Sequence, residues 1–278
     1  GYLLPAFGDK EVGCITKADI LEFRASLAKV TTRSNKQLSP SRINHIMTPL
    51  RMILNEAANR HNFSSPHQGI KSLKVPRTDV EPFSLDEVRL IIEKVRSDFR
   101  DYYTVRFFTG MRTAEIDGLQ WNAVDFERRQ IMVRSTIVNG EIQSTKTDGS
   151  FRAIEMSQLV FDALKRQQQA TGDMKFVFCT RNGSPLSHNN VTKRVWYPLL
   201  RHLGLTKRRP YQSRHTAATL WLAAGESPEW IARQMGHTTT EMLFRVYSRY
   251  VPNLTRQDGS AFERLLKSNF NDFKPDCE

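Results

Sequence analysis

The chain is poor in the features that build metal centres, disulfide frameworks and membrane spans. Its three cysteines lie at positions 14, 179 and 277, a spacing that matches no metal or redox motif. No apolar run approaches the roughly 18 residues of a membrane-spanning helix, and no signal peptide is visible. A G-x-x-x-x-G-K loop for a nucleotide is also missing. We therefore expect a cytoplasmic protein with reduced thiols, no metal, no cofactor and no membrane partner.

Acidic residues are missing from two long stretches, 23–55 and 174–225, although the chain has 29 of them against 41 lysines and arginines. A solvated surface normally mixes both signs, so these stretches indicate surfaces that face phosphates, and the net charge of +12 suits a DNA partner. The DNA contacts that we predict are Arg24, Lys36, Arg42, Arg51, Lys193, Arg194, Lys207, Arg208 and Arg209. Two-metal nucleases need clustered carboxylates, which the second stretch lacks.

The first 76 residues are predicted to form a small helical domain. Thr16-x-x-Asp19 is a capping-box pattern before apolar residues at helical spacing, and Ser39-Pro40 is a second helix start. Pro49 interrupts the second helix and is expected to kink or split it. Residues 75–82 contain two prolines, Pro76 and Pro82, among polar residues. We therefore interpret residues 77–82 as a linker.

Residues 83–278 are predicted to form a second, mixed domain. Ser84-x-x-Glu87 starts a helix, and residues 130–138 are rich in β-formers before the turn signal Asn139-Gly140. Strands are expected at 142–145 and 151–156, and helices at 157–171, 189–203, after Pro210, after Pro228 and at 240–250. The fold class is therefore mainly α with a small antiparallel β-sheet.

The residues of the second domain that carry chemistry are two arginines, a lysine, a histidine and a tyrosine: Arg112, Arg214, Lys146, His237 and Tyr247. Such a set suits metal-free attack on a phosphodiester. Arginine forks hold the phosphate oxygens, the phenol is the nucleophile, and a lysine can protonate the leaving oxygen. Taken singly, each of these residues is more often structural. Glu115 lies one helical turn after Arg112. It either supports the Arg112 side chain or forms an ordinary side-chain ion pair on the helix.

At these residues the sequence resembles the tyrosine recombinases, the integrases of phages and mobile elements. The matching motifs, in the family's order, are TG-x-R-x-x-E at 109–115, R-H-T at 214–216, G-H at 236–237 and V-Y-S at 246–248. The resemblance implies a core-DNA-binding domain, a catalytic domain and a 3′-phosphotyrosyl intermediate. It also selects Tyr247 over Tyr250 and places the catalytic lysine at Lys146. One departure is Tyr211, which stands where the family usually has a histidine and which we include among the catalytic residues.

The function expected from this resemblance is site-specific cutting and rejoining of DNA at attachment sites, for integration or excision of a mobile element. The partners it implies are double-stranded attachment-site DNA, a tetramer of the protein on paired sites, and accessory DNA-bending proteins, at the bacterial nucleoid. A type IB topoisomerase would use the same chemistry but fits the TG-x-R and V-Y-S patterns less well. The alternative from another class is a DNA-binding regulator with weakened catalysis, which Tyr211 keeps open.

Overall fold

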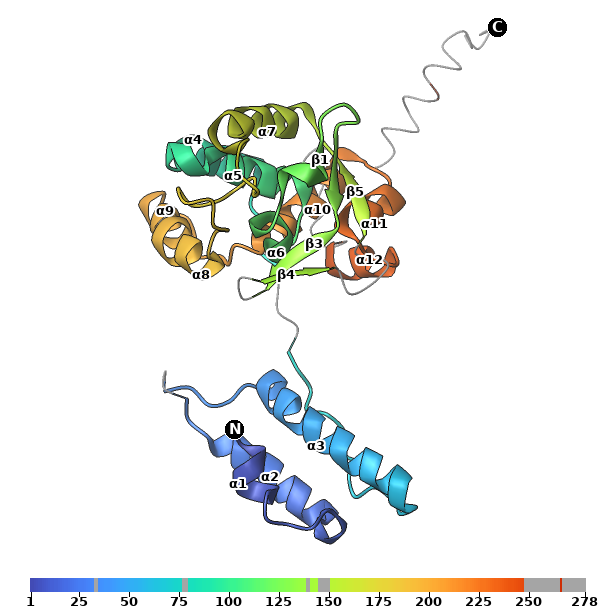
Figure 1. Cartoon of the computed structure of the whole chain (residues 1–278). Coiled ribbons are helices and arrows are strands. Elements are labelled where there is room, and N and C mark those ends of the chain that lie inside the picture. The colour runs from blue at the N-terminus through green and yellow to red at the C-terminus, as the bar shows by residue number, and fades with distance from the viewer. Residues whose placement is uncertain (33–34, 77–79, 139–140, 145–150, 248–265, 267–278) are drawn as a thin grey trace, which may run out of the picture. The chain divides into compact units, whose positions relative to one another are not determined.

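The structure is a computed structural model that describes residues 1–32, 35–76, 80–138, 141–144, 151–247 and 266. The chain divides into two compact units, Gly1–Asp79 and Val80–Glu278 (Figure 1). This division falls inside the stretch 77–82 that we predict as a linker. The end of that stretch is bound to the second unit, because the Glu81 N–H donates to Gln212 Oε1 (3.2 Å) and the Phe83 N–H to Thr216 Oγ1 (2.9 Å).

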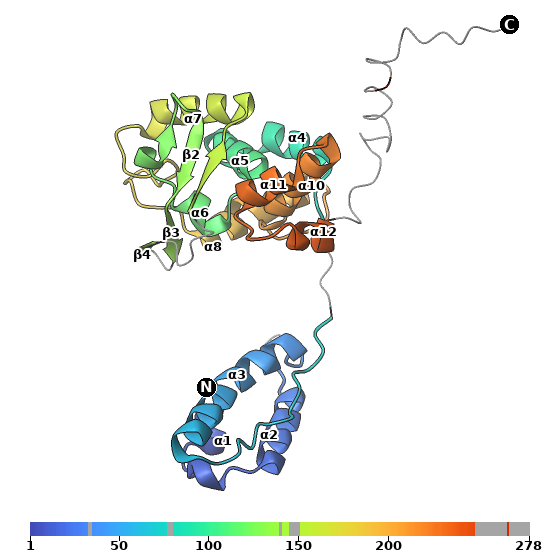
Figure 2. The same ribbon diagram turned by 90° about the vertical axis from the view of Figure 1, so that its right-hand side faces the viewer.

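The first unit is helical. Its helices are α1 (Leu3–Phe7), α2 (Lys17–Lys29) and α3 (Pro40–His61). The predicted capping box at Thr16 is confirmed, since the Asp19 N–H donates to Thr16 Oγ1 (3.2 Å) and the Thr16 N–H to Asp19 Oδ2 (2.8 Å). Apolar side chains of α2 and α3 form one core, and the segment after α3 runs back along the helices (Figure 2). Asn44 fixes that segment with two bonds to the Leu73 backbone, each 2.9 Å long.

Pro49 does not split α3, so that part of the prediction is wrong. The helix is continuous from Pro40 to His61 with Pro49 inside it. Proline removes one backbone donor, which costs about 3 kcal/mol in a helix interior. Burial of Met47, Leu50 and Leu54 on the core face offsets this cost, since each contributes roughly 1.5–3 kcal/mol.

The second unit combines helices with short antiparallel strands, which confirms the predicted fold class. Its helices are α4 (Leu85–Lys94), α5 (Ser97–Thr109), α6 (Thr113–Asp117), α7 (Gln158–Thr171), α8 (His188–Val191), α9 (Tyr197–His202), α10 (Gln212–Ala224), α11 (Pro228–Met235) and α12 (Glu241–Tyr247). Its strands are β1 (Val124–Asp125), β2 (Gln130–Val133), β3 (Ser135–Val138), β4 (Glu141–Ser144) and β5 (Arg152–Glu155). None of the helices in the described residues is long and apolar enough to cross a membrane.

The strands pair in two sheets. One has the order β1-β2-β5 and the other pairs β3 with β4, with Val138 opposite Glu141. The predicted turn at Asn139-Gly140 lies outside the described residues. Strand β5 pairs with β2 in the register Ile131–Ile154, so that both isoleucines face the core. This pairing carries the chain back toward α6 and α11, where the polar network described below is built.

An aromatic core supports the helices. Trp196 is fully buried and contacts the rings of Phe83, Tyr103 and Phe107 at centroid distances of 5.6, 5.2 and 6.2 Å. The basic helix predicted over 189–203 is present as α8 and α9, with a π-helical segment, Thr192–Trp196, between them. Helices α10, α11 and α12 lie side by side in both views (Figures 1 and 2), and they hold the C-terminal motifs.

Candidate active site

The first arginine motif is shaped by a glycine. Gly110 ends α5 in the left-handed conformation, with φ of +60°. A Cβ at this position would lie 3.0 Å from the ring of Trp221 and 3.1 Å from Met235 Sδ, so only glycine fits without strain. The chain then turns directly into α6, whose N-cap residue is Arg112. Gly110 thus places its carbonyl against Arg214 on α10 and places Arg112 against Gly236, which ends α11.

Arg214 is buried beside that turn. It lies on α10 with 2 % of its surface exposed. Nη1 donates to the Gly110 carbonyl (2.5 Å), and Nη2 donates to the Met235 carbonyl. Burial, with a further contribution from the like charge of Arg112, lowers the pKa of Arg214 to about 10. The guanidinium therefore stays charged at neutral pH and is held rigidly by backbone carbonyls.

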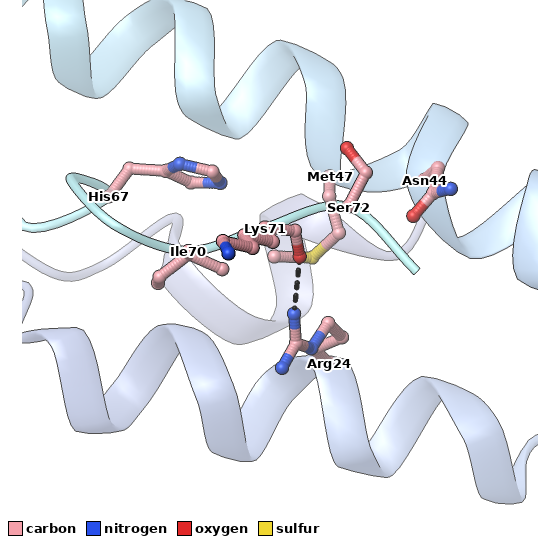
Figure 3. Close-up of a pocket in the computed structure, with 7 residues that line it drawn as sticks. All are labelled: Arg24, Asn44, Met47, His67, Ile70, Lys71 and Ser72. Atoms are coloured by element: carbon pink, nitrogen blue, oxygen red, sulfur yellow. Dashed lines mark hydrogen bonds between the residues drawn. The ribbon is translucent and has the colours of Figure 1, made fainter. Parts of the chain in front are cut away.

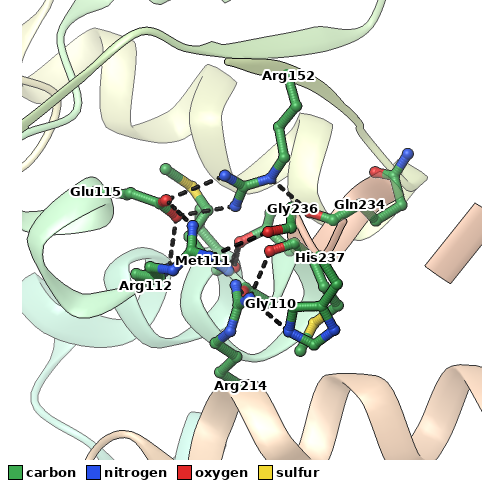
Figure 4. A network of polar contacts seen from close by, with 12 residues as sticks. Gly110, Met111, Arg112, Glu115, Arg152, Arg214, Gln234, Gly236 and His237 are labelled. Atoms are coloured by element: carbon green, nitrogen blue, oxygen red, sulfur yellow. Dashed lines mark hydrogen bonds and ion pairs between the residues drawn. The ribbon is translucent and has the colours of Figure 1, made fainter. Parts of the chain in front are cut away.

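Arg112 shares the same surroundings but is more open. Nη1 donates to Glu115 Oε1 (2.9 Å) and Nη2 to the Gly236 carbonyl (3.1 Å), while 34 % of the side chain is exposed. The carbonyls of residues 110, 235 and 236 therefore anchor both arginines (Figure 4). Anchoring of this kind leaves little reorganisation for the moment when an anion binds.

His237 follows the predicted C-cap glycine, Gly236, which is confirmed by its φ of +66°. Its Nε2 lies 3.3 Å from Arg214 Nη2. Because an arginine only donates, Nε2 is the acceptor and the ring hydrogen is on Nδ1. Burial, followed by the charges of Arg214 and Arg112, lowers the pKa of His237 to about 4, so the ring is neutral at neutral pH. Its Nδ1 is one of two buried side-chain nitrogens in the described residues that have no hydrogen-bond partner.

Glu115 connects Arg112 to a further arginine, Arg152 on β5, which was not predicted from the sequence. Arg152 gives Glu115 two bonds (3.0 and 2.9 Å) and gives the Gln234 carbonyl a third (2.7 Å), as Figure 4 shows. Burial alone would raise the pKa of Glu115, but the bonds from Arg152 and Arg112 outweigh it and lower that pKa to about 2. The sequence held a signal for this role of Arg152. Alternate residues of a strand face the same side, so Arg152 lies on the buried face with Ile154, where a charged side chain needs a partner.

Tyr247 lies on α12 close to this cluster and is 2 % exposed. Its hydroxyl is 2.7 Å from Nδ1 of His215, the middle residue of the R-H-T motif, for which no role was predicted from the sequence. Burial raises the pKa of Tyr247 well above its ordinary value. Tyr250, the competing nucleophile, and Lys146, the predicted general acid, both lie outside the described residues.

Tyr211 precedes α10 and is 44 % exposed. Its ring meets the ring of His215 edge-on, with centroids 5.1 Å apart. Tyr211 therefore packs beside His215, the residue that follows Arg214 on α10, and its predicted catalytic role stays a prediction.

The predicted DNA contacts divide into exposed and bonded cations. Exposed cations occur in both units: Lys36, Arg42, Arg51, Lys193, Arg194, Lys207 and Arg209. Arg24, in contrast, is half-buried in a pocket of the first unit and donates to the Lys71 carbonyl at 2.9 Å (Figure 3). Arg24 therefore fixes the segment after α3, and any contact with DNA would be in addition to that bond.

Arg208 differs from the exposed cations among the predicted DNA contacts. Its guanidinium gives two bonds to Glu87 (2.8 and 2.9 Å) and lies 4.3 Å above the ring of Phe83. Only 14 % of the side chain is exposed. The charge is paired with Glu87 inside the protein, where it ties the segment before α10 to α4, and a contact between Arg208 and DNA stays a prediction.

Comparisons with known proteins agree with this geometry. The profile described as "Phage integrase family" matches residues 83–253. "Putative defective protein IntQ" of Escherichia coli (strain K12) is 27% identical over 98% of this chain and 77% of its own length. "Prophage integrase IntR" of the same strain is 28% identical over 86% of this chain and 66% of its own length. The "ICEBs1 integrase" of Bacillus subtilis (strain 168) is 25% identical over 94% and 74%.

Solved structures share the fold. The Tn1549 transposon integrase in complex with a circular intermediate DNA superposes with a TM-score of 0.73 at 20% identity, over 96% of this chain and 91% of that one. A lambda integrase dimer bound to a core site gives 0.66 at 15% identity, over 92% and 86%. The family profile covers more than half of the sequence, and the chain therefore belongs to the phage integrase family and is a tyrosine recombinase, a site-specific DNA recombinase of mobile elements.

Proposed function

We propose that Tyr247 is the nucleophile of this recombinase and that Arg112, Arg214 and His237 bind the scissile phosphate of an attachment site. The phenolic oxygen attacks phosphorus, a 3′-phosphotyrosyl bond forms, and the bond to the 5′ oxygen breaks. Lys146 gives its proton to that departing oxygen. The reverse reaction rejoins strands, and because the phosphoester bond is conserved, the cycle needs neither a nucleotide cofactor nor a metal.

The observation that carries this proposal is the convergence of Arg112 and Arg214 on one backbone turn. Both guanidinium groups are held by carbonyls of residues 110, 235 and 236, and His237 follows directly. Charged donors fixed in advance stabilise the additional negative charge of a pentavalent phosphate, and loss of one such donor typically costs about 2.7–4 kcal/mol of barrier. The unpartnered Nδ1 of His237 supplies one more donor in the same place.

Duplex DNA is the proposed partner. Phosphate contacts come from the exposed cations of both units, such as Arg42 and Arg51 in the first and Lys193 and Arg194 in the second. We further propose that the protein acts as a tetramer on paired attachment sites, with accessory DNA-bending proteins, at the nucleoid in the cytoplasm. The solved relatives support DNA and multimers, since they include complexes with transposon end DNA, a dimer on a core site and a tetramer on a Holliday junction.

A test uses attachment-site DNA with a nick close to the cleavage position, so that the short 5′ product diffuses away and the covalent complex accumulates. Denaturing electrophoresis in the presence of EDTA should show a protein–DNA adduct. Tyr247→Phe should abolish the adduct and leave DNA affinity unchanged, whereas Tyr250→Phe should retain it. If Tyr250→Phe removes the adduct and Tyr247→Phe does not, the nucleophile is misassigned. Intact binding with no adduct from the wild-type protein would favour the DNA-binding regulator.

A further inference from the structure

His215 is placed to act on the proposed nucleophile. It lies on α10 directly after Arg214, and its Nδ1 is 2.7 Å from the hydroxyl oxygen of Tyr247 on α12. Tyr247 is 2 % exposed, so water has little access to that hydroxyl. The hydrogen bond therefore joins a buried phenol to the residue beside a phosphate-binding arginine.

The chemistry of this pair defines the direction of the hydrogen bond. Burial, followed by the charge of Arg214, lowers the pKa of His215 to about 4, and burial raises the pKa of Tyr247. At neutral pH the imidazole is therefore neutral and the phenol keeps its proton. A phenol is the stronger donor of the two, so Tyr247 donates and Nδ1 accepts through its lone pair.

A phenol needs a proton acceptor when it attacks phosphorus. Its proton must leave as the new bond forms, and an acceptor within hydrogen-bond reach of the reacting oxygen meets the geometric requirement for a general base. Of the groups that surround Tyr247, Arg214 has no lone pair to offer and the ring of Tyr211 meets His215 rather than Tyr247. The acceptor that the structure places on the hydroxyl is His215 Nδ1.

We propose that His215 is a catalytic residue that holds the hydroxyl of Tyr247 and receives its proton during strand cleavage. This inference rests on the proposed function of Tyr247. As the oxygen–phosphorus bond forms, the phenolic proton moves to Nδ1, and the bond to the 5′ oxygen breaks as that oxygen takes a proton from Lys146. During rejoining, His215 returns the proton to the departing phenolate. The bound phosphate is an anion, and it offsets the charge of Arg214 that disfavours a protonated His215 in the free protein.

The charged and titratable groups around His215 come from each helix packed against α10. Helix α12 presents Tyr247, and the turn after α11 presents His237. Helix α5 presents Arg106, which is bonded to Ser213 at 3.0 Å. The helix of His215 and its cap contribute Arg214 and Tyr211. None of these groups, all taken from the part of the chain that the structure describes, is a carboxylate, and we take the bound phosphate as the source of negative charge.

The first experiment compares two substitutions in the full chain. His215→Phe keeps a flat ring but removes the acceptor, and His215→Asn keeps a polar atom near the position of Nδ1 but cannot take the proton. Single-turnover adduct formation on nicked DNA should fall by about 10²–10⁴-fold in both variants, with DNA affinity unchanged. His202→Asn, at an exposed histidine on α9, is the matched control and should react like the wild-type protein.

The pH profile separates a proton acceptor from a structural residue. The wild-type rate should be flat between about pH 6 and about pH 9, because the acceptor is already neutral there. In both variants only the ionised phenol can attack, so the rate should rise about tenfold per pH unit over the same range. Variants that are slow but keep a flat profile would show that His215 only packs against Tyr247, and variants as fast as the wild-type protein would also overturn the proposal.

A modified substrate identifies which proton transfer a substitution has removed. DNA with a 5′-bridging sulfur at the cleavage position has a leaving group that needs no acid. It should restore the rate of Lys146→Ala but leave His215→Phe slow. Restoration of His215→Phe would assign His215 to the leaving group and refute its role on Tyr247. Failure of the wild-type protein to form any adduct, in contrast, would refute the proposed function itself.

Discussion

Both units carry exposed cations, but among the described residues the fully buried arginines lie in the second unit. In the first unit Lys36, Arg42 and Arg51 are exposed. In the second unit Arg106, Arg152 and Arg214 are 1, 8 and 2 % exposed, and hydrogen bonds hold each guanidinium in place. A DNA backbone offers many equivalent phosphates, for which flexible surface charges suffice. A single reacting phosphate needs fixed donors, and burial provides them at the cost of desolvation.

Arg106 is a buried arginine whose hydrogen bonds connect three helices of the second unit. It donates to Ser213 Oγ, Tyr102 Oη and Thr113 Oγ1 at 3.0, 2.8 and 2.6 Å, and thereby joins α5, α6 and α10. The Tyr102 hydroxyl in turn donates to Asp117 Oδ1 (2.6 Å). The helices that carry Arg112 and Arg214 are therefore joined by the hydrogen bonds of a third arginine, Arg106.

The largest expected effect comes from removing one buried arginine of the second unit. Arg152→Met leaves Glu115 with half of its bonds, and loss of a partner from a buried pair costs about 3–5 kcal/mol of the free energy of unfolding. Arg166→Met is the matched control, because Arg166 pairs with Asp101 at the surface with 52 % of its side chain exposed, and it should cost less than about 1 kcal/mol. Urea denaturation measures both, and equal losses would remove the distinction between buried and exposed arginines.

Acid should weaken the same network. The pKa of Glu115 is lowered from 4.5 to about 2 in the folded chain, so its stabilisation is fully present above pH 4.5 and is lost as the pH falls toward 2. That shift corresponds to about 3 kcal/mol. The wild-type protein should therefore lose about that much more stability than Glu115→Gln over this interval, as followed by urea denaturation at each pH. Parallel profiles for the two proteins would show that Glu115 is not the group responsible.

A smaller effect is expected at Tyr211, which is 44 % exposed. If its hydroxyl donates to the phosphate, Tyr211→Phe should raise the barrier to cleavage by about 1–3 kcal/mol. Tyr211→His should retain activity and add a titration near pH 6.5, the value of a free imidazole. Single-turnover rates across pH measure both variants. A Phe variant as fast as the wild-type protein would leave Tyr211 as a packing partner of His215.

The smallest effects belong to the surface cations. Lys36→Ala, Arg42→Ala and Arg51→Ala should each reduce the salt dependence of DNA binding, by about 0.9 in the slope of log K against log salt for each phosphate that the side chain neutralises. Arg208→Ala is the contrasting variant, since it should leave that slope unchanged and reduce stability through the loss of its bonds to Glu87. A reduced slope for Arg208→Ala would return this residue to the DNA-binding surface.

Local features of the fold were predictable from the sequence. The capping boxes at Thr16 and Ser84 and the C-cap at Gly236 depend on residues within a few positions of each other, and all are present. Partners distant in the sequence were not predictable. The pairing of β5 with β2 and the bonds from Arg152 to Glu115 and Gln234 depend on tertiary packing that no local pattern encodes.

The candidate site was predictable in part for the same reason. Arg112, Arg214 and His237 were identified through motifs, and the structure brings them together. His215 stood inside one of those motifs but was not singled out, because its hydrogen bond with Tyr247 spans 32 positions of the chain. The continuous helix through Pro49 is the converse case, in which core burial overrides a local breaker.

Tyr247 should form the covalent bond to DNA within a site of fixed arginines and without a metal. Peptide mapping by mass spectrometry of the adduct, formed on nicked attachment-site DNA in EDTA, tests this most directly. We expect a peptide that carries nucleotide on Tyr247. A nucleotide on any other residue, or an adduct that forms only when a divalent metal is supplied, would contradict the proposed mechanism.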